Sequence, residues 1–377
     1  MPSSSVTNSR REFLSDSAGL LLAGGIPVTL HAMAQESTGP GRSGSTSASK
    51  VHRIIIDTDP GVDDALAILL ALRSPELKVE AITAVAGNVP LELTLSNALR
   101  LIEIAGRTDV PVAAGASSPL ERRLVIADYF HGENGLAGVE FPSPVTRPVA
   151  ESASDLIRRM VRGSPNEISI VAVGPLTNVA TALRADRALA GVIRSIVLMG
   201  GSLSGGNVTP SAEFNIYADP EAARIVFDAG IPLTMVGLDV TRKVLLREEH
   251  IRILEAGKNA ASQAAGRIMR RTLDRALKAG EGTDMPMHDP LTVAHVIDPG
   301  ILKLKNYFIA VETSGEMTAG ETVGYTRAPI FKSAPLKTGS TTTASPDAPF
   351  RPNAMVAIDV QPERFFHLFL ERLAGPA

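Results

Sequence analysis

The sequence predicts an α/β fold in which helices flank an open, mostly parallel central sheet. After about residue 50, short apolar runs alternate with amphipathic stretches, which is the pattern of parallel strands connected by helices. A hydrophobic fraction of 44% with 20% charged residues is ordinary for a globular protein. Four carboxylates follow the first apolar run. Ligands of open α/β sheets bind at the carboxyl ends of the strands, so we expect the functional site there.

The first elements show how each was assigned. Residues 52–56 end in three isoleucines and predict a buried strand, and a Pro60–Gly61 turn follows it. Residues 63–73 predict a helix, because apolar side chains recur at helical spacing. By the same criteria, further strands are expected at 79–85, 168–173, 193–199, 233–236 and 355–360. Further helices are expected near 91–105, 176–183, 220–227 and 363–373.

Two segments depart from this alternation. Residues 252–278 are rich in Ala and Arg and predict one helix beside the entrance of a cleft. Residues 332–352 are dense in Ser, Thr, Pro and Ala and predict a mobile loop. We expect residues 51–377 to form a single domain that contains both.

The amino-terminal segment predicts export. Arg10 and Arg11 precede an apolar stretch at 18–30, and an Ala-Met-Ala sequence at 32–34 fits a cleavage site. Residues 1–34 therefore resemble a twin-arginine signal peptide, although a weak membrane anchor or a misassigned start site is the alternative. Residues 35–50, rich in Ser, Thr and Gly, predict a disordered linker. A periplasmic or secreted location is expected.

Composition excludes several classes of site. The net charge of −3 argues against a nucleic-acid partner held by bulk electrostatics. The chain has no Cys, which excludes disulfides, thiolate metal sites and Cys nucleophiles. Any metal ligand must then be oxygen or His.

An acidic cluster follows the first predicted strand. Asp57, Asp59, Asp63 and Asp64 fall within eight residues. One or two of them could simply cap the next helix. Four together repel one another and raise one another's pKa unless a cation compensates, which favours a hard divalent metal.

Other segments offer the remaining groups of such a site. One turn cannot surround a calcium ion, and Asp289 could complete its shell while His288 faces the same cavity. A capping Asp beside a surface His is the alternative for that pair. The Gly-rich loop at 205–215 carries Asn207, Glu213 and Asn215, which suit the vicinal hydroxyls of a sugar unless they only satisfy the loop's own backbone. Asn88, after the second strand, could join them.

Together these segments resemble the inosine-uridine preferring nucleoside hydrolase family. The resemblance runs from about residue 54 to the last helix, and its motifs occur in the family's order. They lie at residues 57–64, 87–88, 174–178, 213–216 and 288–290. It implies the Rossmann-like fold of that family, with the active site at the carboxyl ends of the strands.

The resemblance also implies roles for individual residues. One Ca²⁺ per subunit would be bound by Asp59, Asp64, Asp289 and the main-chain carbonyl of Val173. The substrate-binding positions are Asp63, Asn88, His131, Met199, Asn207, Glu213, Phe214 and Asn215. Among these, Met199 and Phe214 line the pocket, and His131 closes it over the base unless it is only a surface His on a Gly-rich turn.

The implied reaction is hydrolysis of the N-glycosidic bond of ribonucleosides to base and ribose. This cleavage develops positive charge on the sugar ring and negative charge on the departing base. Asp59 would act as general base toward a calcium-activated water, with inversion, and His288 as proton donor to the base. The substrate is a small ribonucleoside, no membrane contact is expected after signal removal, and a homo-oligomer, dimer or tetramer, is expected.

Two other functions compete with this one. An Asp-x-Asp sequence at a strand end also occurs in haloacid-dehalogenase-like phosphatases, but that interpretation leaves Asp63, Asp64 and His288 unexplained. A calcium-dependent binding protein could hold a nucleoside without cleaving it. The presence of every expected catalytic position disfavours the second alternative.

Overall fold

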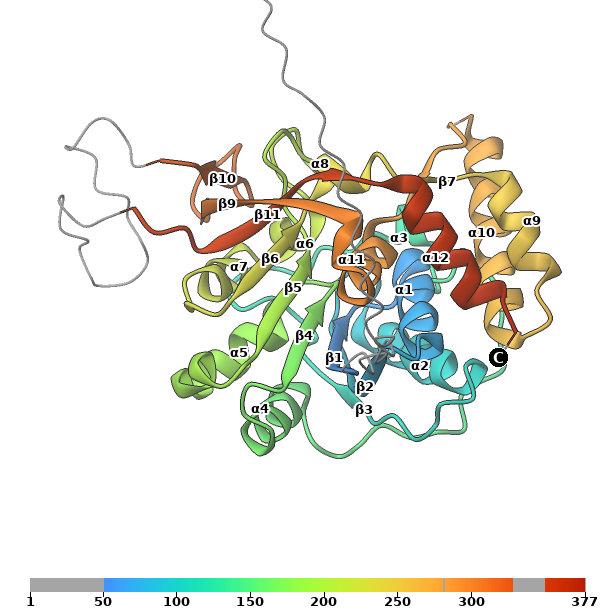
Figure 1. The fold of residues 1–377 in the computed structure, drawn as a ribbon, viewed down its shortest axis with the longest axis horizontal. Helices are drawn as coiled ribbons and strands as arrows, with labels where there is room; N and C mark the ends of the chain where they lie inside the picture. The colour runs from blue at the N-terminus through green and yellow to red at the C-terminus, as the bar shows by residue number, and fades with distance from the viewer. Residues whose placement is uncertain (1–50, 281, 328–349, 377) are drawn as a thin grey trace, which may run out of the picture. The chain divides into compact units, whose positions relative to one another are not determined.

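A nine-stranded sheet forms the centre of the computed structural model, which describes residues 51–280, 282–327 and 350–376 (Figure 1). Its strands are β1 His52–Thr58, β2 Leu77–Ala84, β3 Val112–Ala114, β4 Ile168–Ala172, β5 Ser195–Met199, β6 Leu233–Val236, β9 Leu302–Val311, β10 Thr322–Tyr325 and β11 Ala354–Val360. A separate pair consists of β7 Leu245–Leu246 and β8 Met285–Pro286. All six strands expected from the sequence are present.

Helices connect most of these strands. They are α1 Val62–Arg73, α2 Leu91–Ile104, α3 Asp128–His131, α4 Ala153–Gly163, α5 Thr177–Ala185, α6 Phe214–Ala218, α7 Pro220–Phe227, α8 Leu238–Thr241, α9 Glu248–Ala256, α10 Ala260–Ala279, α11 His288–Ile297 and α12 Pro362–Ala374. The expected α/β class is confirmed.

The sheet is mostly parallel and its order reverses next to β1. The order is β10-β9-β11-β6-β5-β4-β1-β2-β3, and only the pairs that β9 makes with β10 and β11 are antiparallel. From β1 the chain adds β2 and β3 on one side and β4 to β6 on the other. Such a reversal leaves a crevice at the carboxyl ends of the strands. Asp59, Asn88, Val173 and Met199 all stand at or just beyond those ends.

Alternation along β1 builds a core on each face of the sheet. Ile54 and Ile56 belong to one buried cluster, with side chains of α1, α2, α10, α11 and α12. Ile55 points the other way, into a cluster with α4, α5 and α7. Figure 1 shows these two groups of helices on opposite sides of the sheet. Because both faces are covered, the central strand β4 is buried throughout its length.

The single helix expected at 252–278 is wrong. The chain forms α9 and α10 there, because Gly257 takes an extended conformation with φ −61° and ψ 142°. Asn259 then starts α10, and its Oδ1 accepts the N–H of Ser262 at 2.9 Å. Asn is a favoured N-cap residue, so the break is encoded locally.

Several predictions concern residues that lie wholly or mainly outside the described ranges. The signal peptide at 1–34, the linker at 35–50 and all but the last three residues of the 332–352 loop lie outside the described residues. Among the described helices, none combines the length and hydropathy that a bilayer span requires.

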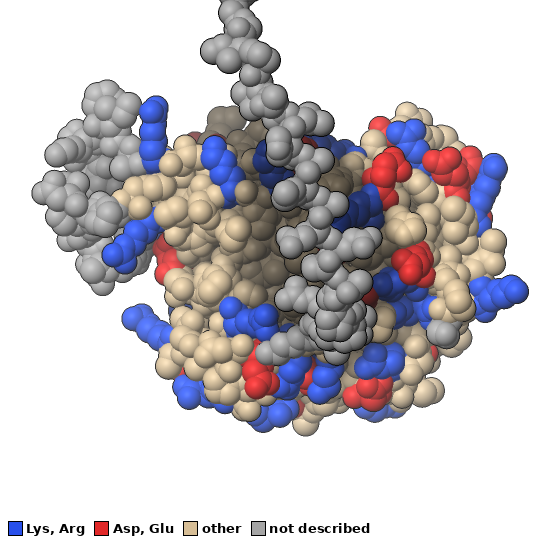
Figure 2. Space-filling view, in the orientation of Figure 1, with Lys and Arg blue, Asp and Glu red and all other residues tan. Residues whose placement is uncertain are grey.

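Opposite charges are interspersed on the face seen in Figure 2. Many charged side chains of the chain are paired, as in Arg53 with Glu80 and Arg372 with Glu76. These two pairs are partly buried, whereas exposed ion pairs each contribute little to stability. The surface charge therefore matters less to this protein than the charge in the crevice.

Candidate active site

A pocket of about 290 Å³ opens at the carboxyl ends of the central strands. Asp59 and Asp64 do not line it, and both are fully buried. The other predicted site residues all line it: Asp63, Asn88, His131, Val173, Met199, Asn207, Glu213, Phe214, Asn215, His288 and Asp289. The structure thus gathers residues from widely separated segments around one cavity.

The turn between β1 and α1 is held by Asp64. Its Oδ2 accepts the N–H of Gly61 at 3.0 Å and the side-chain amide of Asn88 at 2.8 Å. Its Oδ1 accepts the hydroxyl of Thr58 at 2.5 Å and the N–H of Asp59 at 3.2 Å. This network satisfies N–H groups at the start of α1 and joins the ends of β1 and β2.

Asp59 has one oxygen without a protein partner. Its Oδ2 accepts the N–H of Asn88 at 2.7 Å, whereas the buried Oδ1 has no hydrogen-bond partner among the described residues. Two glycines allow the carboxylate to sit there. A Cβ at Gly87 would lie 2.1 Å from Oδ2, and one at Gly174 would lie 2.5 Å from Oδ1. A buried oxygen of this kind is costly unless a ligand, water or cation satisfies it.

The neighbouring carboxylates fit a cation. Ligand oxygens of Asp63, Asp64 and Asp289 lie within 4.8 Å of one another. Burial and the charge of Asp64 raise the pKa of Asp63 to about 7. Burial and the charges of Asp63 and Asp64 hold the pKa of Asp289 well above its usual range, and burial and Asp64 do the same for Asp59. None of these acids forms an ion pair within the described residues, so a divalent cation would offset their repulsion.

This cluster differs from the ligand set expected from the sequence. The grouping includes Asp63 and omits Asp59, although the charge of Asp59 acts on Asp289. The Val173 carbonyl, the expected main-chain ligand, accepts the side-chain amide of Asn215 at 3.0 Å. Val173, Asp63 and Asp289 nevertheless border the same pocket.

The loop from residue 200 to residue 215, here called the sugar loop, forms another wall. Glu213 caps α6: its Oε1 accepts the N–H of Asn215 at 2.9 Å and its Oε2 that of Ile216 at 3.1 Å. Burial raises the pKa of Glu213 to about 7. Asn207 holds the same helix start, because its Oδ1 accepts the N–H of Phe214 at 2.9 Å. Polar groups of the sugar loop thus face the pocket from a fixed frame.

Two histidines border the pocket as neutral rings. Nδ1 of His131 accepts the N–H of Val62 at 3.0 Å, which leaves its proton on Nε2. Nδ1 of His288 lies 2.8 Å from the hydroxyl of Thr241. Burial lowers the pKa of His131 to about 3, and burial together with Arg242 lowers that of His288 to about 4. Desolvation therefore keeps both rings neutral near pH 7.

Sequence reasoning missed several residues at the mouth of the pocket. Tyr129 and Phe130 line it with 69% and 44% of their surface exposed. Arg275 of α10 donates to both of their carbonyls. Arg242 also lines the pocket and donates to the carbonyl of Gly206. The adjacent aromatic pair before His131 was a readable signal, but the arginine contacts depend on tertiary structure.

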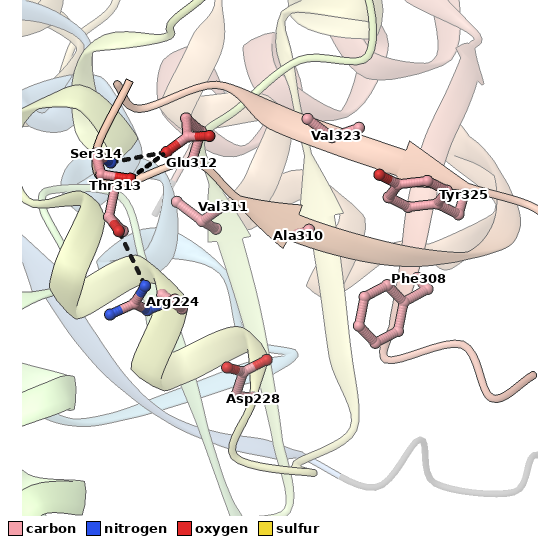
Figure 3. Close-up of a pocket in the computed structure, with 10 residues that line it drawn as sticks. All are labelled: Arg224, Asp228, Phe308, Ala310, Val311, Glu312, Thr313, Ser314, Val323 and Tyr325. Carbon is pink, nitrogen blue, oxygen red and sulfur yellow. Dashed lines mark hydrogen bonds between the residues drawn. The ribbon is translucent and has the colours of Figure 1, made fainter. Parts of the chain in front are cut away.

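A second hollow of about 280 Å³ lies between α7 and the β9–β10 hairpin (Figure 3). Arg224 donates there to the hydroxyl of Thr313 at 2.9 Å. Glu312 accepts the N–H groups of Ser314 and Gly315 at 2.7 and 3.0 Å. None of the acidic cluster lines this hollow, so its chemistry is not that of the first pocket.

Comparison with known proteins gives the family. The inosine-uridine preferring nucleoside hydrolase family matches residues 54–367, most of the chain. The chain belongs to this family. The family is metal-dependent, and the acidic cluster of this nucleoside hydrolase could bind a metal. The chain hydrolyses the N-glycosidic bond of ribonucleosides.

Curated relatives extend the match over most of the chain. A pyrimidine-specific ribonucleoside hydrolase RihA of Photobacterium profundum is 46% identical over 72% of this chain and 87% of its own length. The RihA of Citrobacter koseri is 42% identical over 85% of this chain and 97% of its own length. Both are similar to this nucleoside hydrolase in sequence.

Solved structures agree in fold. A plant nucleoside hydrolase superposes with a TM-score of 0.79 at 34% identity, covering 86% of this chain and all of that one. A purine-preferring ribonucleoside hydrolase from Gardnerella vaginalis gives a TM-score of 0.75 at 32% identity, covering 86% and 98% of the two chains. The phosphatase and binding-protein alternatives are not favoured.

Proposed function

We propose that this nucleoside hydrolase binds one Ca²⁺ through Asp59, Asp64, Asp289 and the carbonyl of Val173. The observation that carries the proposal is the buried Oδ1 of Asp59, which has no partner among the described residues beside a cluster of acids. Oxygen ligands in this number suit calcium better than zinc or a soft metal. Bound calcium would lower the pKa of a water and polarise the sugar hydroxyls.

Asp59 is proposed as the general base. Its Oδ2 is already engaged by the N–H of Asn88, so Oδ1 is the atom available to take a proton from the attacking water. Burial and the charge of Asp64 raise the pKa of Asp59 in the metal-free site. Attack by water predicts inversion at the anomeric carbon.

The ribose is proposed to bind between two walls of the pocket. Asp63 and Asn88 on one side, with Glu213 and Asn215 on the other, would hold the ribose hydroxyls. Negative side chains around the sugar favour the positive charge that develops on it. Met199 and Phe214 add apolar lining.

His288 is proposed to assist departure of the base. Since burial holds its pKa near 4, the ring is neutral at pH 7 and would donate a hydrogen bond, not a proton, to the departing base. The hydrogen bond to Thr241 occupies Nδ1 and directs the other ring nitrogen away from that hydroxyl. His131, also neutral, would close the pocket over the base.

The preferred substrates are proposed to be pyrimidine ribonucleosides. The curated relatives at 46% and 42% identity are named pyrimidine-specific, whereas the structural relative named purine-preferring shares 32%. The sequence signal at 1–34 supports export by the twin-arginine pathway, and a homo-oligomer is proposed from the family resemblance. Cell fractionation and light scattering test those two proposals.

The purified mature chain, incubated with uridine, cytidine, inosine and adenosine, tests the activity and its metal. Base and reducing sugar are followed with and without a chelator, and Ca²⁺ is then restored beside Mg²⁺ and Zn²⁺. Faster cleavage of uridine and cytidine, lost with chelator and restored best by Ca²⁺, is the expected result. Intact nucleosides that stay bound would support the binding protein, and phosphate release from nucleotides without ribose would support the phosphatase.

A matched pair of variants tests the ligand set. Asp59→Asn and Asp63→Asn each remove one negative charge from the same wall. We expect the first to lose calcium and turnover together, and the second to raise KM while calcium stays bound. The opposite pattern would assign Asp63 to the metal, as the distance cluster of Asp63, Asp64 and Asp289 would then indicate.

A further inference from the structure

The carboxylate of Glu213 depends on a turn of the sugar loop that lies far from it in the chain. Its Oε2 accepts the N–H of Gly201 at 2.9 Å, besides that of Ile216. Gly201 has φ +70°, a conformation that favours glycine. The orientation of Glu213 is therefore set partly by where this turn is held.

Thr322 of the edge strand β10 holds that turn, which follows the inner strand β5. Its Oγ1 accepts the N–H of Ser202 at 2.8 Å and donates to the carbonyl of Ser202 at 2.7 Å. Both residues are 4% exposed. One hydroxyl thus satisfies both backbone groups of the residue that follows Gly201, and a Cβ at Gly201 would come within 2.8 Å of it. These constraints make the contact between Thr322 and Ser202 rigid.

The same hairpin supports the far end of the sugar loop. Ala212, just before Glu213, forms an isolated antiparallel bridge with Glu321. The hydroxyl of Ser211 donates to the carbonyl of Met317 at 3.1 Å. The β9–β10 hairpin therefore braces the loop at both ends, although β10 is the edge strand farthest from β3 (Figure 1).

We propose that Thr322 is a positioning residue for ribose recognition, acting through Ser202 and Gly201 on the carboxylate of Glu213. The proposal rests on the assignment of Glu213 to a ribose hydroxyl made above. The Arg224 hollow of Figure 3 lies on the same hairpin but shares no residue with this contact. Loss of the Thr322 hydroxyl leaves buried groups of Ser202 without their partner, so the turn shifts to reach another one.

The test combines variants with sugar analogues. Thr322→Val removes the hydroxyl at nearly constant volume, and Thr322→Ser keeps it. Steady-state kinetics are measured for both, and for Glu213→Gln, on uridine, 2′-deoxyuridine, 3′-deoxyuridine and 5′-deoxyuridine, with Tm recorded for each protein. Thr322→Cys, whose thiol is a weak hydrogen-bonding group, replaces the Val variant if that variant does not fold.

Thr322→Val is expected to raise KM for uridine about tenfold with a smaller change in kcat, since binding geometry and not the chemical group is altered. The increase in KM caused by Thr322→Val should be smaller on the analogue that lacks the hydroxyl bound by Glu213. That analogue is identified as the one whose kinetics Glu213→Gln changes least. Thr322→Ser should restore the KM of the wild type.

Two results would overturn the proposal for different reasons. If Glu213→Gln lowers kcat/KM equally on all four substrates, Glu213 does not recognise a ribose hydroxyl, and Thr322 has no ribose-binding group to position. If Glu213→Gln is selective for one analogue while Thr322→Val lowers Tm and leaves KM unchanged, the ribose assignment stands and Thr322 is only structural. The same conclusion holds if Thr322→Val lowers kcat/KM equally on all substrates.

Discussion

The acidic pocket and the hollow beside the β9–β10 hairpin have almost the same volume, about 290 and 280 Å³, but they differ in how their charges are satisfied. In the second, Arg224 and Glu312 have hydrogen-bond partners in the hairpin and beside it (Figure 3). In the first, buried acids crowd together and Asp59 Oδ1 lacks a partner among the described residues. Volume does not distinguish the two, whereas uncompensated buried charge does.

The difference also follows the sheet. The first pocket lies where parallel strands end beside the reversal of strand order, so side chains from several strands and helix starts converge. The second lies beside an antiparallel hairpin at the edge, where neighbouring residues can satisfy one another. We therefore expect the first pocket to be catalytic and the second not to be. The following experiments test this difference.

Replacing Asp59 by Asn should have the largest effect. We expect kcat to fall about 10³-fold, because the proton acceptor and a negative charge at the metal are removed together. Asp228→Asn, in the second hollow, is the control and should stay within about twofold of wild type. Near wild-type turnover of Asp59→Asn, with the fold checked by circular dichroism, would end its role as base.

Replacing Asp289 by Ala should weaken calcium binding by about two orders of magnitude, since a hard cation loses a charged oxygen ligand. Isothermal titration of the chelated protein measures the affinity, and elemental analysis measures the metal that remains after purification. Asp228→Ala is the matched control. An unchanged calcium content in Asp289→Ala would remove it from the ligand set.

Chelation should lower Tm more at high pH than at low pH. Burial raises the folded-state pKa of Asp63 and Glu213 to about 7, above that of an unfolded acid. The stability they contribute is present below the unfolded pKa, near 4, and is lost as pH rises through about 7. Between pH 5 and 8 the metal-free protein should therefore lose about 5 °C or more of Tm, and calcium should offset the loss. Calorimetry across that range tests this, and a Tm that rises with pH in chelator would contradict it.

Replacing Arg224 by Met should have the smallest effect. The variant loses the hydrogen bond to Thr313, which costs about 0.5–1 kcal/mol of unfolding free energy, while kcat/KM stays within about twofold. Urea unfolding and uridine cleavage measure the two quantities. A tenfold loss of activity would mean that the second hollow takes part in function, and the comparison between the hollows would fail.

Local pattern was enough to predict six of the nine strands of the sheet and the acidic turn, but it missed β3, β9 and β10. Both faces of β1 are covered, so consecutive positions of this strand carry isoleucine. This continuous apolar run can be recognised in the sequence without knowledge of the fold. Asp59, Asp63 and Asp64 stand out because repulsion between neighbouring charges is itself a local signal. The Asn259 cap that divides α9 from α10 was also local, and it was overlooked.

Other features were decided only by tertiary structure. Burial, which no local pattern measures, lowers the pKa of His288 to about 4. The contact of Thr322 with Ser202 spans 120 residues, and nothing near either residue announces it. The sequence by itself determined which elements form and which acids crowd one turn, because those depend on neighbours along the chain. The partners of Asp59, the neutral histidines and the support of the sugar loop depend on neighbours in space, which only the packed sheet brings together.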